Sequence, residues 1–422
     1  MKILVVGGGG REHAIIKKLR ENPSVSTIYA LPGNGGIGKD ATCVPILATE
    51  IDKIVAFAAE KSVDFAVVAP DDPLAMGCVD RLHEKNIPCF GPDAKAAQIE
   101  ASKVFSKNLM AKYQIPTAKY AVFDNLDAAL SYLDTAPIPT VIKADGLALG
   151  KGVIIAQTRQ EAKDAATDMI QNGKFGKSGA KIVIEEFLTG PEVSVLAFTD
   201  GHCLRPMVSS MDHKRAGDSD VGLNTGGMGT IAPNPYYTEE IAARCMEEIF
   251  LPTVDAMVQE GCPFKGCLYF GLMLTPNGPK VIEYNCRFGD PETQVVLPLL
   301  ETDLLTIMQA VENETLSSLD IRWKKEHAAC VILASGGYPE HYEKGKTITF
   351  TAPMPKNATC YHAGTKLEGE KILTSGGRVL GITATAPTLE KAIADAYAAA
   401  DTVEFEKKYL RRDIGKRALE VT

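Results

Sequence analysis

Two features are missing from this sequence: long apolar runs and paired cysteines. The chain opens with Met-Lys and then only Ile3 to Val6, too short for the apolar core of a signal peptide, and no later run approaches the length that spans a membrane. The ten cysteines are scattered singly, without a Cys-x-x-Cys pair or a histidine cluster at metal-binding spacing. This argues against a zinc site or a disulfide framework. We therefore expect a cytoplasmic protein with reduced thiols.

Blocks of like charge are missing as well. Positive and negative residues are interspersed and the net charge is -8, which argues against a nucleic acid or an anionic membrane as partner. The charge pattern does not exclude a small anionic substrate that binds in a locally basic cleft. The content of 45% apolar and 23% charged residues is ordinary for a soluble globular protein. Because 422 residues exceed the usual size of one hydrophobic core, we expect about two to four domains.

The N-terminal part of the chain alternates between strand and helix signals. A buried-type strand, Ile3 to Val6, leads through Gly7 to Gly10 into an amphipathic helix that ends near Arg20. Further strands are expected at 28–30, 65–68 and 88–90, and helices at 51–61 and up to Leu82. This alternation predicts a doubly wound α/β domain that closes near residue 100 and binds ligands at the carboxyl ends of its strands.

The turn at Gly7 to Gly10 does not fit a dinucleotide site well. Counting Gly-x-Gly-x-x-Gly from Gly7 places Glu12 where the third glycine should pack the helix against the strand, and no ribose-binding acid follows the second strand. We favour a contact with a phosphate or ribose phosphate, with a purely structural tight turn as the alternative.

A second glycine-rich segment, Lys143 to Gly152, joins two predicted strands at 141–143 and 152–156. It fails the Walker pattern, because it has three residues between its glycines, has no Ser or Thr after Lys151, and does not open a helix. A mobile flap over a triphosphate, with charge from Lys143 and Lys151, is the better physical interpretation. A surface hairpin with incidental lysines is the alternative.

The middle of the chain supplies further candidates. Glu185 to Leu188 follow a predicted strand at 181–184, where their backbone groups suit an adenine edge and Glu192 suits the ribose; a plain strand end is the alternative. The glycine-punctuated passage Met211 to Thr230 is too long for a routine loop, which favours a functional one. Helices are expected at 93–113, 160–170 and 238–259.

The densest signal is a predicted β-hairpin with strands at 269–274 and 280–284. Side chains two apart on a strand share a face, so Glu283 and Asn285 should project together, with Ile282 and Tyr284 on the other face. A carboxylate beside an amide oxygen suits Mg²⁺. Arg287, Asp290 and Glu292 follow at once. The alternative is an exposed hairpin end with solvated charges. A last α/β unit is expected from helices at 299–313 and 389–397 and strands near 328–333, 347–349 and 378–384.

Taken together, these segments resemble the phosphoribosylamine-glycine ligase family of ATP-grasp enzymes. The resemblance covers essentially the whole chain in order, through the strings GGREHA, LPGN, FGP, KADGLALGKGV, IVIEEFL, DHKR, NTGGMG, YFGLML, VIEYNCRFGDPETQ, GGYP, HAGTK, GGRVL and RRDIG. The most specific are IEYNCRFGDPE and DHKR with NTGGMG. The chain departs from the family pattern at Gly8, at Leu149 and at Asp71, which keeps the usual glutamate's charge with a shorter reach.

The resemblance implies a multidomain α/β and α+β fold. Expected are an N-terminal Rossmann-like domain at 1–102, an ATP-grasp domain at 103–325 with a mobile subdomain at about 121–190, and a C-terminal domain at 326–422. It also implies ligation of glycine to 5-phosphoribosylamine with ATP, through glycyl phosphate, in purine biosynthesis. Mg²⁺ or Mn²⁺ would assist, and transfer of this kind needs charge and positioning more than covalent help from the protein.

The resemblance further implies roles for individual residues. ATP phosphates would meet Lys103, Lys143 and the flap residues Gly146, Gly150, Lys151 and Gly152, and adenosine would meet Glu185, Phe187, Leu188 and Glu192. Glu283 and Asn285 would hold the metal. Arg287 would offset charge on the acyl phosphate, with Asp212, Lys214, Asn224 and Gly226 near glycine. The phosphoribosyl group would lie among Gly9, Gly10, Arg11, Glu12, Asp71, Asp290, Lys366 and Arg378.

Other functions stay open at this point. One is an ATP-grasp ligase or carboxylase for another step, such as carboxylation of an aminoimidazole ribonucleotide. A nicotinamide-dependent oxidoreductase or a non-catalytic nucleotide-binding protein is the alternative from a different class. Nothing in the sequence demands more than a monomer, and we expect no further enzymatic domain after Thr422.

Overall fold

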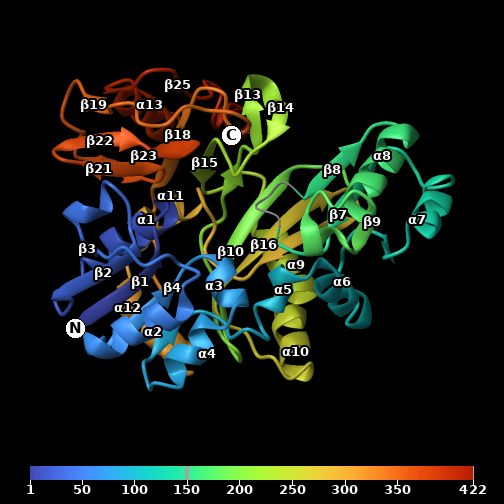
Figure 1. Ribbon diagram of the computed structural model, residues 1–422, viewed down its shortest axis with the longest axis horizontal. Helices are drawn as coiled ribbons and strands as arrows, with labels where there is room; N and C mark the ends of the chain where they lie inside the picture. Colours follow the sequence, from blue (N-terminus) through green and yellow to red (C-terminus); the bar gives the residue numbers. More distant parts are fainter. Residues whose placement is uncertain (148–151, 422) are drawn as a thin grey trace.

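Four main sheets, each covered by helices, carry the described part of the fold (Figure 1). The structure is a computed structural model that describes residues 1–147 and 152–421. The predicted class, a multidomain mixture of α/β and α+β units, is confirmed. Within the described residues, no helix has both the length and the apolar character needed to cross a membrane.

The N-terminal unit is a parallel sheet in the strand order β3-β2-β1-β4-β5. Residues Ile3 to Val6 form its fully buried centre, and both neighbouring strands pair with them in parallel. This is the doubly wound sheet that the alternating pattern predicted. Its elements are β1 Lys2–Gly7, α1 Gly10–Leu19, β2 Thr27–Pro32, β3 Thr42–Cys43, α2 Ile51–Glu60, β4 Phe65–Val68, α3 Asp71–Ala75, α4 Cys78–His83 and β5 Cys89–Phe90.

Two predicted helices are interrupted. The helix expected up to Leu82 breaks at Gly77, whose φ of 80° suits glycine and ends α3 before α4 begins. The helix expected over 93–113 is wrong in extent, because Ser102 is extended and separates α5 Gln98–Ala101 from α6 Lys103–Lys112. The Ser102 hydroxyl accepts a hydrogen bond from the Phe105 N–H and caps α6. Lys103 is therefore the first residue of a helix.

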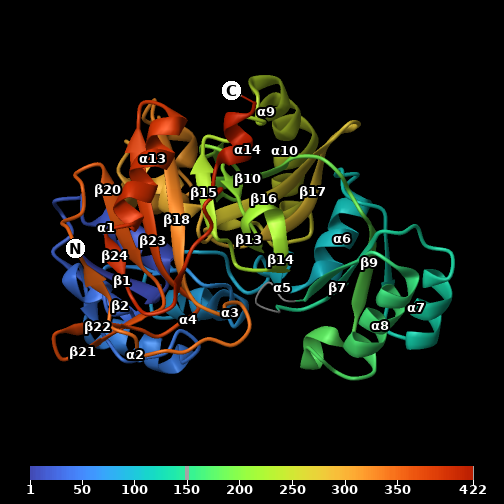
Figure 2. The same cartoon turned by 90° about the horizontal axis from the view of Figure 1, so that it is seen from above.

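A small subdomain stands out from the rest of the chain, as Figure 2 shows. Its sheet has the order β6-β9-β7-β8, with a core of its own formed by residues such as Ile142, Ala166 and Ile184. The predicted glycine-rich segment joins β7 to β8, but residues 148–151 lie outside the described residues. The elements are β6 Tyr120–Phe123, α7 Leu126–Leu133, β7 Thr140–Ala144, β8 Val153–Ala156, α8 Arg159–Ile170 and β9 Ile182–Glu186.

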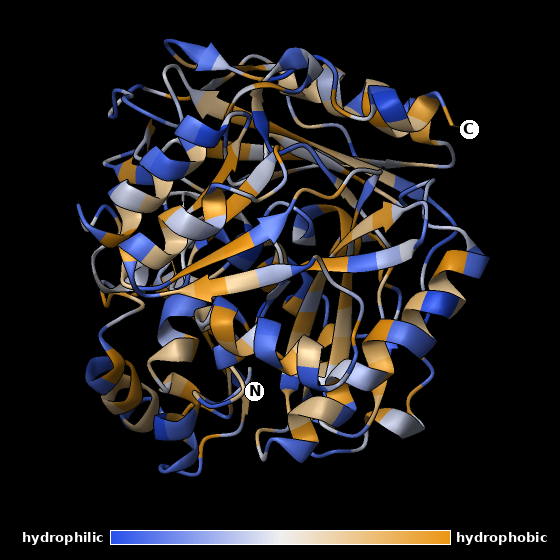
Figure 3. Cartoon of the chain, turned by 90° about the vertical axis from the view of Figure 1, so that its right-hand side faces the viewer, coloured by the Kyte–Doolittle hydropathy of each residue, from blue (hydrophilic) through white to orange (hydrophobic). Residues whose placement is uncertain are grey.

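The central sheet carries the predicted hairpin in the order β11-β10-β16-β17. Apolar residues gather on the strands and on the helix sides that face them (Figure 3). Phe250 packs on Phe270 with ring centroids 4.3 Å apart, which fixes the continuous helical segment 239–259 against the sheet. The elements are β10 Glu192–Asp200, β11 Leu204–Pro206, α9 Glu239–Cys245, a π-helical turn η4 Met246–Phe250, α10 Leu251–Gln259, β16 Lys265–Thr275 and β17 Gly278–Asn285.

The hairpin contains a β-bulge that the strict alternation of side chains did not predict. Gly271 pairs with Glu283, but the next residue, Leu272, pairs with Val281, so Ile282 has no partner in the ladder. Tyr284 faces the core as predicted, with its hydroxyl near that of Thr253. Ile282 and Tyr284 both border the cleft that Glu283 lines, Tyr284 while it also belongs to the apolar core. The bulge at Ile282 is the departure from strict alternation.

The C-terminal sheet takes two of its strands from the middle of the chain. Its order is β12-β15-β18-β23-β20, with β25 also paired to β18. The passage 211–230 is thus only partly a loop, because both of its ends join this sheet. The elements are β12 Met211–Asp212, β15 Gly229–Ala232, β18 His327–Ser335, β20 Ala358–His362, β23 Arg378–Ala386, α13 Leu389–Ala400 and β25 Lys408–Tyr409.

The remaining elements are short. The strand pairs are β13 Arg215–Gly217 with β14 Val221–Asn224, β19 Thr349–Phe350 with β24 Val403–Glu404, and β21 Thr365–Glu368 with β22 Lys371–Thr374. The helices are α11 Thr293–Val296, α12 Leu304–Glu312 and α14 Lys416–Leu419. The 3₁₀ turns are η1 Ile37–Lys39, η2 Gly176–Gly179, η3 Asp218–Asp220, η5 Leu297–Leu299 and η6 Leu316–Ser318.

The end of the chain holds the β13–β14 hairpin in place. Arg411 is 1% exposed; its guanidinium pairs with Asp413 at 2.8 Å and Asp220 at 2.9 Å and donates to the Arg215 carbonyl at 3.0 Å. His213 is also 1% exposed; its Nε2 accepts from the Gly415 N–H and its Nδ1 donates to the Gly229 carbonyl, both at 3.1 Å. These contacts fix a neutral imidazole. His213 of the DHKR string therefore has a structural position.

Acid should destabilise the fold through His213. Burial, assisted by the nearby Arg411 charge, lowers the pKa of His213 to about 4, below the usual value of about 6.5. Between these values the unfolded chain binds the extra proton, so the free energy of unfolding should fall as pH falls from about 6.5 to about 4, by on the order of 3 kcal/mol from this group. Urea titrations at several pH values would measure it.

The variant His213→Gln should lose less stability than the natural chain over this pH interval, even though it starts less stable at neutral pH. His202→Gln is the matched control, because His202 is exposed and faces Glu314 only at 3.7 Å. Equal pH slopes for the natural chain and His213→Gln would contradict the assignment.

Candidate active site

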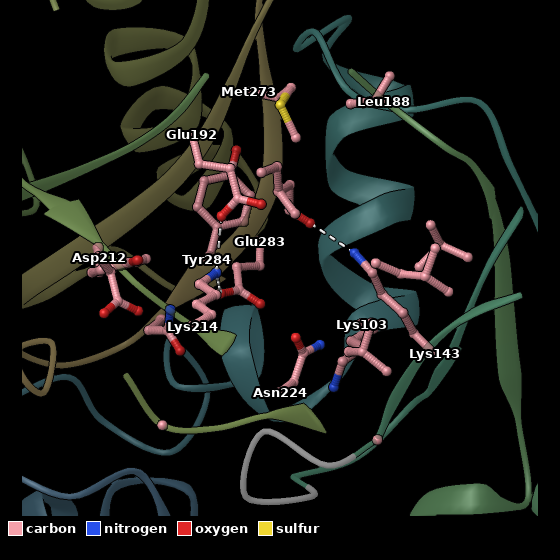
Figure 4. Close-up of a pocket in the computed structure, with 18 of the residues that line it drawn as sticks. Lys103, Lys143, Leu188, Glu192, Asp212, Lys214, Asn224, Met273, Glu283 and Tyr284 are labelled. Carbon is pink, nitrogen blue, oxygen red and sulfur yellow. Dashed lines mark hydrogen bonds and ion pairs between the residues drawn. The ribbon is translucent and has the colours of Figure 1, made fainter. Parts of the chain in front are cut away.

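A cleft of about 890 Å³ lies between the small subdomain, the central sheet and the β13–β14 hairpin. It brings together most of the predicted site residues, as Figure 4 shows for ten of its lining residues. The predicted residues on its lining are Arg11, Asp71, Lys103, Lys143, Gly152, Glu185, Phe187, Leu188, Glu192, Asp212, Lys214, Asn224, Gly226, Glu283, Asn285, Arg287, Asp290 and Arg378. Segments far apart in sequence therefore converge on one site.

Glu283 lies at the centre of the positive charge in this cleft. The Lys214 ammonium is 3.5 Å from the Glu283 carboxylate and 3.5 Å from that of Glu192. Lys214, opposing the effect of burial and helped by Lys143 and Lys103, lowers the pKa of Glu283 to about 2. Burial by itself lowers the pKa of Lys214, but the Glu283 and Glu192 carboxylates raise it well above the ordinary value. Both groups are thus charged at neutral pH.

A second ionic cluster joins the small subdomain to the cleft. Lys143 contacts one oxygen of Glu185 at 3.0 Å, and Lys107 contacts the other at 2.9 Å. Lys143 also donates to the Ile282 carbonyl at 2.9 Å, beside the bulge. The Glu185 backbone pairs with β6 and β7, and its carbonyl accepts from the Thr140 hydroxyl. Glu185 lines the cleft beside Phe187 and Leu188, and its contact with an adenine edge stays a prediction.

Lys103 reaches the cleft from the start of α6. Its ammonium donates to the Gly146 carbonyl at 3.1 Å, and burial lowers its pKa while Glu283 opposes that effect. Asp145 fixes the start of the helix by accepting from the Val104 N–H at 2.8 Å and the Ser102 hydroxyl at 3.0 Å. Gly146 itself is not on the cleft lining, and Gly150 and Lys151 lie outside the described residues.

Arg287 is held by acids on the N-terminal side of the cleft. Its guanidinium contacts Glu100 at 3.0 Å and Asp71 at 4.0 Å, and Glu100 also accepts from the Cys286 N–H at 2.7 Å. Burial opposes the charged form of Arg287, but Glu100 and Asp71 outweigh it and raise the pKa of this guanidinium. Its Nε has no hydrogen-bond partner among the described residues. An Arg287 donor is thus left for a ligand.

Buried oxygens line the end of the cleft near Asp212. The Tyr269 hydroxyl lies 2.8 Å from that of Ser194 and donates to Glu292 at 3.1 Å. Burial and the nearby Glu292 charge raise the pKa of Asp212 well above its usual range. Asp212 accepts from the His213 N–H at 2.7 Å, and the structure thereby fixes it toward the cleft. This end is suited to a small ligand that carries hydrogen-bond donors.

A third group of charges extends toward the first glycine-rich turn. Arg378 contacts the Asp290 carboxylate at 3.2 Å and donates to the Asp290 carbonyl at 2.8 Å. The side chain of Gln294 donates to the other Asp290 oxygen at 2.7 Å. Arg11 donates to the Phe288 carbonyl at 3.2 Å and lies on the cleft lining. Both Asp290 and Glu292 line the cleft.

Four predicted substrate residues are not on the cleft lining. Glu12 is buried; one oxygen accepts from the Gly9 N–H and the other from the Arg11 Nε, both at 2.6 Å. The Gly9 amide is therefore unavailable to a phosphate, and Gly10 is packed against Gln294. Lys366 lies on β21 and pairs with Glu368 at 3.4 Å. The same use of Glu12 argues against a dinucleotide turn at this point.

Sequence reasoning missed several residues of the site. Lys107 was detectable, because it is one helical turn after Lys103 on α6 and so shares its face. Glu292 was noted only as part of the charged stretch after the hairpin. Glu100 and Tyr269 carry no local signal, because each belongs to the site only through a partner distant in sequence. Glu100 forms an ion pair with Arg287, and the Tyr269 hydroxyl donates to Glu292.

Comparison with protein-family models gives three matches in order along the chain. The N domain of phosphoribosylglycinamide synthetase matches residues 1–100, its ATP-grasp (A) domain matches residues 101–293, and its C domain matches residues 328–417.

Curated relatives match over nearly the whole chain. The phosphoribosylamine-glycine ligase of Caldanaerobacter subterraneus subsp. tengcongensis is 48% identical over 98% of this chain and 99% of its own length. The corresponding ligase of Vibrio cholerae is 45% identical over 99% of both chains. A bifunctional purine biosynthetic protein of Pichia angusta is 46% identical over 99% of this chain, which spans only 54% of that relative.

Solved structures agree with the family matches. The crystal structure of phosphoribosylamine-glycine ligase from Thermotoga maritima superposes with a TM-score of 0.86 at 33% identity, covering 98% of this chain and 100% of that one. Biotin carboxylase from Campylobacter jejuni has a TM-score of 0.76 at 15% identity over 97% of this chain and 92% of its own, which is a likeness of fold alone. With its three family domains in order and relatives aligned from end to end, this chain belongs to the phosphoribosylglycinamide synthetase family.

Proposed function

We propose that this chain is an ATP-dependent ligase of purine biosynthesis that joins glycine to 5-phosphoribosylamine and releases glycinamide ribonucleotide, ADP and phosphate. The observation that carries the proposal is one continuous cleft in which ionised Glu283 lies among lysines and which runs on to Arg287 and Asp212. Relatives named phosphoribosylamine-glycine ligase, aligned over nearly their full length, support it.

ATP is proposed to lie with its phosphates near Lys103 and Lys143 and its adenosine near Phe187, Leu188 and Glu192. Both lysines line the cleft on the side of the small subdomain, and Phe187 and Leu188 line it with apolar surface. Lysine is a compact point charge that suits phosphate oxygens. We propose that Gly152, on the cleft lining, approaches the triphosphate; the predicted flap residues Gly150 and Lys151 lie outside the described residues.

A divalent metal accompanies ATP in the ATP-grasp class, and the donor set of this cleft fits one. Glu283 offers an ionised carboxylate and Asn285 an amide oxygen, both on the lining. No group of three or more His, Cys, Asp or Glu side chains suited to a metal occurs among residues 1–147 and 152–421. Two protein ligands suit Mg²⁺, which keeps waters and phosphate oxygens as its other ligands. We propose Mg²⁺ or Mn²⁺, and the metal would offset charge on the transferring phosphate.

The proposed reaction has two steps. A glycine carboxylate oxygen attacks the γ-phosphorus of ATP; the new O–P bond gives glycyl phosphate as the bond to the ADP oxygen breaks. The amine nitrogen of 5-phosphoribosylamine then attacks the acyl carbon, the C–N bond forms, and phosphate leaves with the proton lost by the amine. Negative charge develops on the phosphoryl oxygens in the first step and on the acyl oxygen and the leaving phosphate in the second. We propose that Arg287 and Lys214, which line the cleft, offset it.

Glycine and the phosphoribosyl acceptor are assigned to two adjoining parts of the cleft beyond ATP. Asp212, Lys214, Asn224 and Gly226 form the first part, where the buried carboxyl suits the amino group of glycine. Arg11, Asp290 and Arg378 form the second, where two guanidiniums suit a phosphate and a carboxylate suits ribose hydroxyls. The two parts meet where Arg378 donates to the Gly226 carbonyl at 2.6 Å. Asp71 is proposed to support Arg287.

Other parts of the proposal concern the whole chain. We propose domain boundaries at 102 and 325, a cytoplasmic location, small-molecule substrates and a monomeric state. The pairing of Arg378 with Asp290 brings the C-terminal unit to the same cleft as the hairpin, so the proposed domains act on one site.

The first test is turnover with glycine, 5-phosphoribosylamine and MgATP. Glu283→Gln should lower the release of ADP and phosphate by about 100-fold or more, because the amide cannot offset Lys214 or hold the metal as a charged ligand. The far-ultraviolet circular dichroism spectrum should stay unchanged. Glu370→Gln, at an exposed position outside the cleft, is the matched control and should turn over normally.

Two outcomes would overturn this proposal. One is full metal-dependent turnover by Glu283→Gln. The other is ATP hydrolysis by the natural chain that needs bicarbonate and ignores glycine, which would favour a carboxylase.

Arg287→Lys tests the charge that faces the acyl phosphate. Lysine keeps the positive charge but cannot contact Glu100 and also aim a second donor into the cleft. We expect kcat to fall by about 100-fold with the KM for ATP nearly unchanged, since the loss is felt most in the transition state. Arg205→Lys, outside the cleft, should change neither constant. A rise in the KM for ATP at constant kcat would place Arg287 at the nucleotide instead.

A further inference from the structure

A second cavity, of about 440 Å³, lies between helix α1 and the C-terminal sheet. Figure 2 shows α1 beside β20 and β23, the strands that form one wall. The cavity shares no lining residue with the active-site cleft. We call it the basic groove; its polar lining residues are Lys17, Lys18, Arg20, Glu21, Asp40, Lys324, Lys356, Asn357, Thr359, Tyr361, Thr383 and Thr385.

Positive charge in the basic groove exceeds negative charge. Five of its residues are Lys or Arg, whereas Glu21 and Asp40 are its only acids, although the whole chain has a net charge of -8. Lys17 pairs with Asp40, and Lys18 pairs with Glu21. The other three cations, Arg20, Lys324 and Lys356, have no carboxylate partner within the described residues. Three convergent charges are thus left unbalanced.

Two of these cations are held in place by the backbone. Arg20 donates to the Asp40 carbonyl at 2.7 Å, and Lys324 donates to the Pro298 carbonyl at 2.9 Å. Lys18 is 7% exposed and uses two of its three N–H donors, on the Leu300 carbonyl and on Glu21. Ordinary surface lysines move freely in solvent, but Lys18 and Arg20 at the end of α1 and Lys324 from a distant segment are bonded to the backbone and line one cavity.

The wall opposite α1 is made of hydroxyl groups. Thr359 on β20 pairs with Thr383 on β23, and Thr385 follows on the same face of the strand. The alternate residues, Ile382 and Ala384, face the apolar core on the other side of the sheet. Thr383 is 2% exposed, and its hydroxyl has no hydrogen-bond partner of ordinary geometry among the described residues, with only the weakly bonding Cys330 thiol beside it. A buried unpartnered hydroxyl is costly unless something else bonds to it.

We propose that the basic groove binds a phosphoryl group, as inorganic phosphate or as the phosphate of a nucleoside monophosphate. A tetrahedral oxyanion takes hydrogen bonds from ammonium, guanidinium and hydroxyl donors together, and these are the three donor types that line the groove. The cavity volume lies within the range of about 300–1,000 Å³ that is usual for small-molecule sites. The simpler alternative, lysines that only offset the dipole at the end of α1, does not account for Lys324, Lys356 or Thr383, which lie on other elements.

The test is calorimetric titration of the whole chain with inorganic phosphate and, separately, with AMP. The groove variant is Lys324→Ser with Lys356→Ser, and the charge-matched control is Lys53→Ser with Lys85→Ser, at exposed positions on the N-terminal unit. The natural chain and the control should each bind one equivalent of the probe in the basic groove. The groove variant should bind that equivalent about tenfold or more weakly, so it should be missing from the isotherm of this variant. Added salt should weaken that binding in the natural chain.

Phosphate and AMP both also suit the active-site cleft, so the difference between the two double variants is the measurement. If the groove variant loses the extra equivalent of both phosphate and AMP, the site recognises the phosphoryl group itself. If it loses only the equivalent of AMP, the site recognises a nucleotide. Identical isotherms for the groove variant and the control would overturn the proposal, as would the absence of any extra equivalent in the natural chain. Ligase turnover and circular dichroism of the groove variant should match the control, which separates this result from failure to fold and from the proposed function.

Discussion

The carboxylate of Glu283 is the centre on which the active-site cleft depends. Lys103 comes from the start of α6, Lys143 from β7 and Lys214 from the segment after β12, so three ammonium groups from three parts of the chain converge. At about 4 Å, like charges repel by roughly 1 to 4 kcal/mol, depending on how much water surrounds them. Glu283 offsets part of this repulsion from a rigid strand, and Glu192 and Glu185 share the task. The lysines are therefore positioned for an anion before it arrives.

Local patterns in the sequence were enough to predict much of this arrangement. The hairpin that carries Glu283 and Asn285 has an apolar run, a turn and a second strand within some twenty residues, and all of that information is local. The parallel N-terminal sheet was equally readable, because Ile3 to Val6 and Phe65 to Val68 are continuous apolar strands separated by helices. Strand and helix signals at 141–143 and 160–170 predicted elements of the small subdomain, and the family resemblance implied the subdomain itself.

What the sequence could not reveal lies in contacts between distant segments. The Glu185 carbonyl accepts from Thr140 and its carboxylate contacts Lys107 and Lys143, partners that no local pattern indicates. The Gly9 amide donates to Glu12, three residues later. Lys366 belonged to a recognisable string, yet its strand turns the ammonium toward Glu368, outside the cleft. The alternation of side chains along a strand does not predict the bulge at Ile282, because the extra residue is apolar like Val281 before it.

Strands β12 and β15 bound the passage that carries Lys214 and Asn224, and both belong to a sheet whose centre, β18, is made almost a hundred residues later. During synthesis from the N-terminus, this passage leaves the ribosome before β18 is made, so Met211 can pair with Ile231 but Ile231 lacks its second partner, Ala329. Arg411 and Gly415, which complete its support, are made later still. A nascent chain that stalls before them carries a nearly finished hairpin at Glu283 but no finished site.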